Sequence, residues 1–137
     1  MKNHYELTET AFETQFKNCE LDPSIFSHEA HLRLAWIHIT KYGVKQAEEN
    51  IHNQLLTYVK SLGAEGKYNK TLTIAATKAV YHFIQKSTTT TFEAFVNEFP
   101  RLKLNFKELM QHHYGFDIFN SEEAKKEFFE PDLLPFN

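Results

Sequence analysis

The sequence predicts an all-α fold, and two observations support that prediction. Apolar residues recur every three or four positions along several stretches, which places them on one face of a helix. The chain of 137 residues contains only 4 glycines and 4 prolines, and they fall between these stretches, where they end helices. We therefore expect a single compact, bundle-like domain of about six or seven helices over residues 1–137.

The stretches that combine helical periodicity with a start or stop signal are spread over the whole chain. We expect helices at about residues 8–18, 27–42, 44–62, 70–86, 92–99, 105–113 and 121–130. The first begins at Thr8 or Thr10, whose hydroxyl accepts a hydrogen bond from the first turn. Ser27 caps the second helix in the same way, and Gly43 ends it in a left-handed conformation. The third helix has a regular apolar stripe and ends before Gly63.

The C-terminal half of the chain carries the same kinds of signal. The fourth helix ends at the serine and threonine run 87–91, and Thr90 with Glu93 makes a capping box for the fifth. Asn105 opens the sixth helix, and Asn120 or Ser121 opens the seventh. Prolines in the remaining tail exclude a continuous helix, and its apolar residues predict that it packs against the rest of the protein.

Composition and charge exclude several classes of protein. The chain has 15 lysines and arginines against 18 acidic residues and a net charge of -3, so we expect no nucleic-acid partner. Its single cysteine, Cys19, excludes an intramolecular disulfide. It has neither the apolar run of about 18 residues that spans a membrane nor the N-terminal apolar segment of a signal peptide. We therefore expect a cytoplasmic protein with no membrane partner.

The second helix carries an unusual group of histidines. At about 100° per residue, its apolar residues cover nearly the whole circumference, which is typical of a central helix. His28, His31 and His38 form a ridge along one edge of its core-facing stripe. Either each ring bonds to nearby main chain, or the ridge is a site in which His31 acts as general acid or base beside His28. The pair His28 and His31 can also bind a divalent metal if His112 or His113 supplies a third ligand.

A second polar group lies where the fourth helix begins. Thr73 falls inside the apolar face of that helix, and Thr71 lies on its other flank. Thr73 either bonds back to the carbonyl one turn earlier or faces the histidine ridge, together with Tyr68, across a small polar pocket. Arg33 lies on the polar side of the second helix, where it is either a solvated surface charge or bound by a carboxylate, for which Asp132 in the tail is a plausible partner.

Three motifs resemble a family of small uncharacterised bacterial proteins. They are F-S-H-E-A-H-L-R-L-A-W at 26–36, Y-N-K-T-L-T at 68–73 and P-D-L-L-P at 131–135. The family patterns are F-x-H-x-x-H-L-R-x-A-W, Y-H-x-T-x-T and P-D-L-x-P. This chain departs from them at Asn69, where the family often has histidine. The resemblance implies an all-helical fold and a shared site, but no particular reaction.

These observations leave three functions open. The leading one is a small-molecule-binding or catalytic domain, and the sequence does not decide whether it is an enzyme. We expect its catalytic residues to be His31, His28 and Tyr68, and its ligand-binding residues to be Arg33, Thr71, Thr73 and Asp132. The alternatives are an interaction module or homodimer that exposes phenylalanines and the tail, and a histidine-based metal-binding protein with a divalent ion as cofactor.

Overall fold

The structure, a computed structural model, describes residues 3–136 and confirms the all-α prediction. Within that range it contains helices and turns but no strand. The chain divides into two compact units, the first ending at Tyr68 and the second beginning at Asn69. We describe each unit by itself, and the expectation of a single domain stays a prediction. Among the described residues, no helix is long and apolar enough to cross a membrane.

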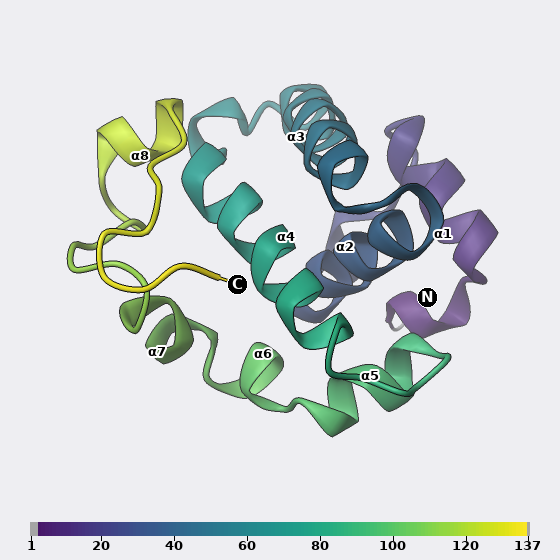
Figure 1. Ribbon diagram of the computed structural model, residues 1–137. Coiled ribbons are helices and arrows are strands. Elements are labelled where there is room, and N and C mark those ends of the chain that lie inside the picture. Colours follow the sequence, from purple (N-terminus) through teal and green to yellow (C-terminus); the bar gives the residue numbers. More distant parts are fainter. Residues whose placement is uncertain (1–2, 137) are drawn as a thin grey trace. The chain divides into compact units, whose positions relative to one another are not determined.

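Unit 1 consists of three α-helices and three short 3-10 helices, coloured purple to blue in Figure 1. In chain order they are η1 (His4–Glu6), α1 (Glu9–Lys17), η2 (Pro23–Ile25), α2 (His28–Tyr42), α3 (Val44–Ser61) and η3 (Glu65–Lys67). Helices α2 and α3 pack against each other, and α1 packs against both. The apolar residues of α2 are buried on nearly all sides of the helix, as its composition predicts. They are Ala30, Leu32, Leu34, Ala35, Ile37 and Ile39.

Unit 2 contains the remaining α-helices, which run from teal to yellow in Figure 1. They are α4 (Lys70–Ile84), α5 (Phe92–Glu98), α6 (Arg101–Leu104), α7 (Phe106–Gln111) and α8 (Glu122–Lys126). Residues 3–136 therefore hold 8 α-helices, one more than expected. The additional one, α6, follows Pro100, whose φ of -64° is already helical and lets the chain start a new turn at once.

The sequence located the starts of the predicted helices, but two of the predicted side-chain caps do not form. The hydroxyls of Thr8, Ser27 and Ser121 accept hydrogen bonds from the first turns of their helices at 3.1–3.2 Å. The capping box at Thr90 is wrong, because Thr91 accepts the bond from the Ala94 amide instead. Asn105 precedes α7, but its side chain makes no capping bond. The two misses lie where several candidate caps are adjacent or where the helix is very short.

Gly43 joins α2 directly to α3. Its φ of 85° confirms that the chain leaves α2 with a positive φ, and its ψ of 161° makes the backbone extended rather than left-handed helical. Only glycine adopts this combination readily. One residue therefore serves as the C-cap of α2 and the N-cap of α3, which fixes the direction in which α3 departs.

The C-terminal tail packs on unit 2 through its main chain and its last aromatic ring. The His113 ring donates from Nδ1 to the Leu134 carbonyl at 2.7 Å, and the His113 carbonyl accepts from the Leu133 amide at 3.0 Å. Phe136 is buried and stacks on the His113 ring with centroids 4.1 Å apart. The side chains of Leu133 and Leu134 remain 60% and 53% exposed, so the tail docks without burying its two leucines.

Candidate functional site

The first turn of α2 presents two exposed histidines on one side of the helix. His28 is the first residue of α2 and His31 follows one turn later, and both are exposed. The His31 ring lies nearly parallel to the Phe26 ring, with centroids 4.0 Å apart and an interplanar angle of 25°. One face of the imidazole therefore rests on an aromatic ring, and the residue remains open to solvent.

A cluster of buried aromatic rings holds Phe26 in place. Its centroid lies 5.2 Å from that of Phe16 and 5.3 Å from that of Tyr58, and these two rings lie 5.0 Å apart. Phe16 and Tyr58 are fully buried, and the Tyr58 hydroxyl donates to the Leu21 carbonyl at 2.9 Å. The Phe26 and Tyr58 rings meet edge to face, the Phe16 ring is tilted against both, and rings packed in this way have little freedom to turn. His31 is therefore the exposed outer layer of a rigid stack.

The nitrogens of His31 make no hydrogen bond within residues 3–136, which distinguishes this ring from the other α2 histidines. Desolvation and, to a smaller extent, the charge of the nearby His28 lower the pKa of His31 from 6.5 to about 4. His31 is therefore a neutral imidazole at pH 7, with one nitrogen able to donate and the other able to accept.

His38, the third member of the predicted ridge, has a different environment. It is buried, its Nδ1 accepts from the Asn50 side-chain amide at 3.4 Å, and its Nε2 is buried without a hydrogen-bond partner in the described part of the chain. Desolvation lowers the pKa of His38, against a smaller opposing effect of Glu13. The ridge is therefore divided into two exposed rings at the start of α2 and one buried ring near its end.

Tyr68 has a histidine partner that the sequence analysis did not assign. Its hydroxyl forms a hydrogen bond with Nδ1 of His52 on α3, and the two rings lie 5.4 Å apart. Both residues are half-buried. The pair forms because η3, which precedes Tyr68, packs against α3. No local pattern predicts such a pairing, since it depends on how the chain turns back after α3.

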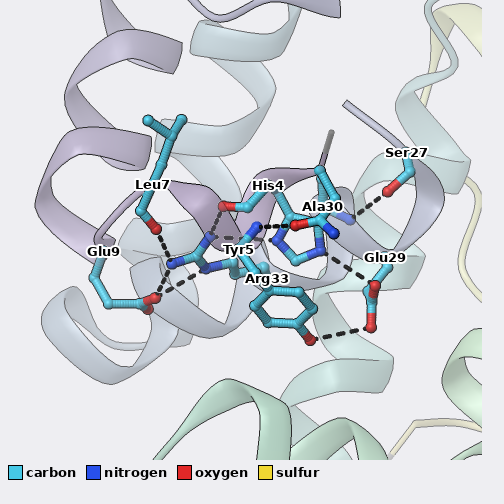
Figure 2. Close-up of polar contacts among 9 residues, drawn as sticks. His4, Tyr5, Leu7, Glu9, Ser27, Glu29, Ala30 and Arg33 are labelled. Atoms are coloured by element: carbon cyan, nitrogen blue, oxygen red, sulfur yellow. Dashed lines mark hydrogen bonds and ion pairs between the residues drawn. The ribbon is translucent and has the colours of Figure 1, made fainter. Parts of the chain in front are cut away.

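Arg33 is a buried residue whose guanidinium is fully occupied by unit 1 itself (Figure 2). Its Nε donates to the Glu9 carboxylate at 2.8 Å, and one terminal nitrogen donates to the same carboxylate and to the Leu7 carbonyl. The other terminal nitrogen donates to the His4 carbonyl and lies 3.3 Å from the His4 Nδ1. Every N–H group of the guanidinium thus has an acceptor, and none is left for a ligand.

We call this arrangement the Arg33 clamp (Arg33, Glu9 and the His4 and Leu7 carbonyls). It corrects two expectations for Arg33, its exposure and its carboxylate partner. Arg33 is 4% exposed rather than on a solvated face. Its carboxylate partner is Glu9, not Asp132, which lies in unit 2 and accepts a hydrogen bond from the Gly115 amide at 2.8 Å. The sequence could not reveal this because Glu9 lies 24 residues away in the chain, and several carboxylates are equally plausible partners.

His4 extends the Arg33 clamp to the start of α2 (Figure 2). Its Nε2 bonds to the Glu29 carboxylate at 3.2 Å, and Glu29 also accepts from the Tyr5 hydroxyl at 3.1 Å. Desolvation lowers the pKa of His4, against the opposing effect of Glu29. In the neutral form, Nε2 donates to Glu29 and Nδ1 accepts from Arg33. These bonds attach the η1 segment to α2, which is a structural role.

The candidate residues of unit 2 are also engaged in structural bonds. The buried Thr71 hydroxyl donates to the Glu127 carbonyl at 2.7 Å and accepts from the Phe129 amide at 3.1 Å. Thr73 donates to the Asn69 carbonyl at 2.7 Å, one turn earlier, which is the simpler of its two predicted roles. Asn69 caps α4 by accepting from the Leu72 amide, so this helix start already has an acceptor.

The comparisons and the metal-ligand geometry give no further assignment. No family model matches the chain, and no curated protein or solved structure is significantly similar to it. Among residues 3–136, no three side chains of His, Cys, Asp or Glu gather as ligands for one ion. Of the predicted site residues, His28 and His31 lie together on α2, and Tyr68 pairs with His52 in the same unit.

Proposed function

We propose that the protein binds a small molecule at the first turn of α2, with His31 as the main polar contact. The observation that carries this proposal is the His31 ring, which is fixed against Phe26, is exposed, and makes no hydrogen bond within the described residues. Imidazoles that serve only structure bond to nearby acceptors, as His4 and His113 do in this protein. The His31 ring is held in place while its nitrogens have no hydrogen-bond partner in the part of the chain that the structure describes, so it is preorganised to bind a ligand.

The chemistry of the imidazole ring limits the kinds of ligand that it can bind. A neutral imidazole offers one donor and one acceptor, so it suits a hydroxyl, amide or heterocyclic nitrogen better than it suits a fixed charge. If a reaction takes place, an imidazole with a lowered pKa acts as a general base at neutral pH. His28, one turn away, is the expected second contact.

The proposal is tested by imidazole NMR with matched alanine variants. Wild-type protein is titrated with a set of neutral heteroaromatic and hydroxylated fragments while the His31 ring protons are observed. We expect saturable shifts of these protons and of the His28 ring protons in wild type and in His112→Ala, which removes another exposed histidine, and no shift of the His28 ring protons in His31→Ala. We also expect His31→Ala to change the free energy of unfolding by less than about 1 kcal/mol.

A different result would show that the ring serves stability alone. His31→Ala would then lower the free energy of unfolding by several kcal/mol, and no fragment would shift the His31 protons of the wild type. Fragment shifts that persist in His31→Ala would place the binding elsewhere.

The three sequence motifs also support a proposal about the family, the organism class and the cellular location of the protein. We propose that the protein is a bacterial, cytoplasmic member of the family they resemble, with His28 and His31 in the shared site. The single-domain organisation belongs to the same proposal. In this chain Asn69 caps α4 and donates to the Ile118 carbonyl at 2.7 Å. The Asn69 side chain therefore makes two structural hydrogen bonds in this chain, where the family often has histidine.

A second function, self-association, is favoured by the exposed tail leucines. Leu133 and Leu134 are 60% and 53% exposed although the main chain around them is held by His113. Two adjacent exposed leucines on a fixed backbone are an apolar surface that a second copy of the chain can cover. Light scattering over a range of protein concentrations tests this, with Leu133→Ser/Leu134→Ser as the variant. A protein that stays monomeric at every concentration would contradict self-association.

A further inference from the structure

Unit 2 contains a cavity of about 320 Å³ that is separate from the histidines of α2. It lies between α7 and the segment 114–119 that follows it. Met110, Tyr114 and Ile118 line it and are otherwise buried. The Tyr114 hydroxyl donates to the Phe129 carbonyl at 2.7 Å, so its hydrogen bond is already made and the ring contributes apolar surface. Phe116 and Phe119 add aromatic surface to the lining.

Two polar side chains enter the lining from one side of α7. Lys107 and Gln111 are four residues apart, so they project from the same face of the helix on consecutive turns. Within residues 3–136, the Lys107 ammonium has no ion pair and the Gln111 amide has no hydrogen bond. The Lys107 ammonium and the Gln111 amide therefore border the cavity and can donate hydrogen bonds to a ligand.

The carboxylate in the lining, Asp117, is occupied by its own turn. One of its oxygens accepts from the Phe119 amide at 2.9 Å, and the other accepts from the Asn120 side-chain amide at 2.7 Å. The hydrogen bond from Asn120 lowers the pKa of Asp117, and Lys107 makes a smaller contribution. Asp117 is therefore ionised at neutral pH and stabilises the loop, and Lys107 lies beyond ion-pair distance of it.

We propose that this cavity binds a small monocarboxylic acid with an apolar body. The carboxylate is bound by Lys107 and Gln111, and the body lies against Met110, Tyr114 and Ile118. A pocket with apolar walls and a few polar groups at one side is the usual form of a small-molecule site. The volume is about twice the roughly 150 Å³ of a cavity that holds benzene, which leaves room for one ring and a short acid chain.

Methionine NMR on the full chain tests this directly. The sequence has 2 methionines, Met1 and Met110, so labelled methyl groups give one signal from the cavity and one internal control. The probe is 3-phenylpropanoate at pH 7, and 3-phenylpropanol is the neutral analogue of similar shape. We expect a saturable shift of the Met110 methyl signal with the acid and at least tenfold weaker binding of the alcohol.

Charge variants show whether Lys107 is responsible for the preference. We expect Lys107→Leu to weaken binding of the acid at least tenfold while leaving binding of the alcohol unchanged, since Lys107 is exposed and its loss does not disturb the core. The matched control is Lys126→Leu, which replaces an exposed lysine on α8 that does not line the cavity. The proposal is overturned if the acid leaves the Met110 signal unmoved at millimolar concentration, or if the acid and the alcohol bind equally in wild type and Lys107→Leu.

Discussion

Arg33 shows how a charged side chain can lie in the core of a small helical unit. It is 4% exposed, and its guanidinium is covered on its faces by Tyr5 and Phe12, 5.7 Å and 4.9 Å from their ring centroids. Desolvation of a cation is unfavourable unless each donor finds an acceptor. The Arg33 clamp meets that condition with one carboxylate and two main-chain carbonyls.

Replacing Arg33 by methionine should lower the free energy of unfolding by about 3 kcal/mol, because the carbonyls of the buried residues His4 and Leu7 then lose their hydrogen-bond partner. Chemical denaturation measures the effect. Lys41→Met is the matched control, since Lys41 is 49% exposed and its ion pair with Glu13 lies at the surface. That variant should be much less destabilised than Arg33→Met, because water screens an ion pair at the surface. Equal losses in the two variants would contradict the interpretation of Arg33 as a buried anchor.

The buried histidines make stability depend on pH. Desolvation lowers the pKa of His4 and of His38 below 6.5 in the folded protein. Below pH 6.5 the unfolded chain therefore takes up protons that the folded one resists, so stability is full above that pH and falls as the pH drops. Each unit of lowered pKa contributes about 1.4 kcal/mol to this loss.

Denaturation at several pH values between 5 and 7.5 measures this dependence. We expect His38→Leu to flatten it, because the variant removes one of the groups that must be protonated on unfolding. His112→Ala, which removes an exposed ring, should leave the slope unchanged. A wild-type stability that rises on acidification would show that the two pKa shifts have the opposite sign.

At the scale of the helices, local signals account for most of what the sequence predicted. Caps such as Ser27 and the positive φ of Gly43 depend on neighbouring residues only, and they located the boundaries of α2 correctly. The partners of Arg33 and Tyr68 depend on packing instead. Glu9 and His52 come from other helices, so no periodicity or spacing singles them out. The histidine side of α2 was visible in the sequence, but the division into exposed and buried rings was not.

Thr71 and Thr73 give a matched test of long-range and local bonds in one helix. The Thr71 hydroxyl connects α4 to two main-chain groups after α8, whereas Thr73 bonds only within its own helix. We expect Thr71→Val to lower the free energy of unfolding by about 2–3 kcal/mol, because the Glu127 carbonyl and the Phe129 amide lose their partner. Thr73→Val should cost less than about 1 kcal/mol. Thermal and chemical denaturation of both variants measure the two changes. A larger loss of stability in Thr73→Val than in Thr71→Val would contradict the prediction.

At the scale of the whole molecule, the open question is whether the two units unfold together. The single tryptophan, Trp36, lies in unit 1, and Met110 lies in unit 2. Trp36 fluorescence and the Met110 methyl signal therefore report on the units separately. The prediction of one domain requires both probes to give the same denaturation midpoint, and Arg33→Met in unit 1 to shift both. Midpoints that separate would divide the chain into two domains.

The Arg33 clamp has a consequence for how the first residues of the chain can vary. Two of its acceptors, at positions 4 and 7, are peptide oxygens, which any amino acid supplies. The contact therefore recognises the course of the backbone and is indifferent, in these two bonds, to the side chains attached there. A substitution at position 7 that keeps the backbone path therefore keeps its bond to Arg33, whereas position 9 has to supply a carboxylate.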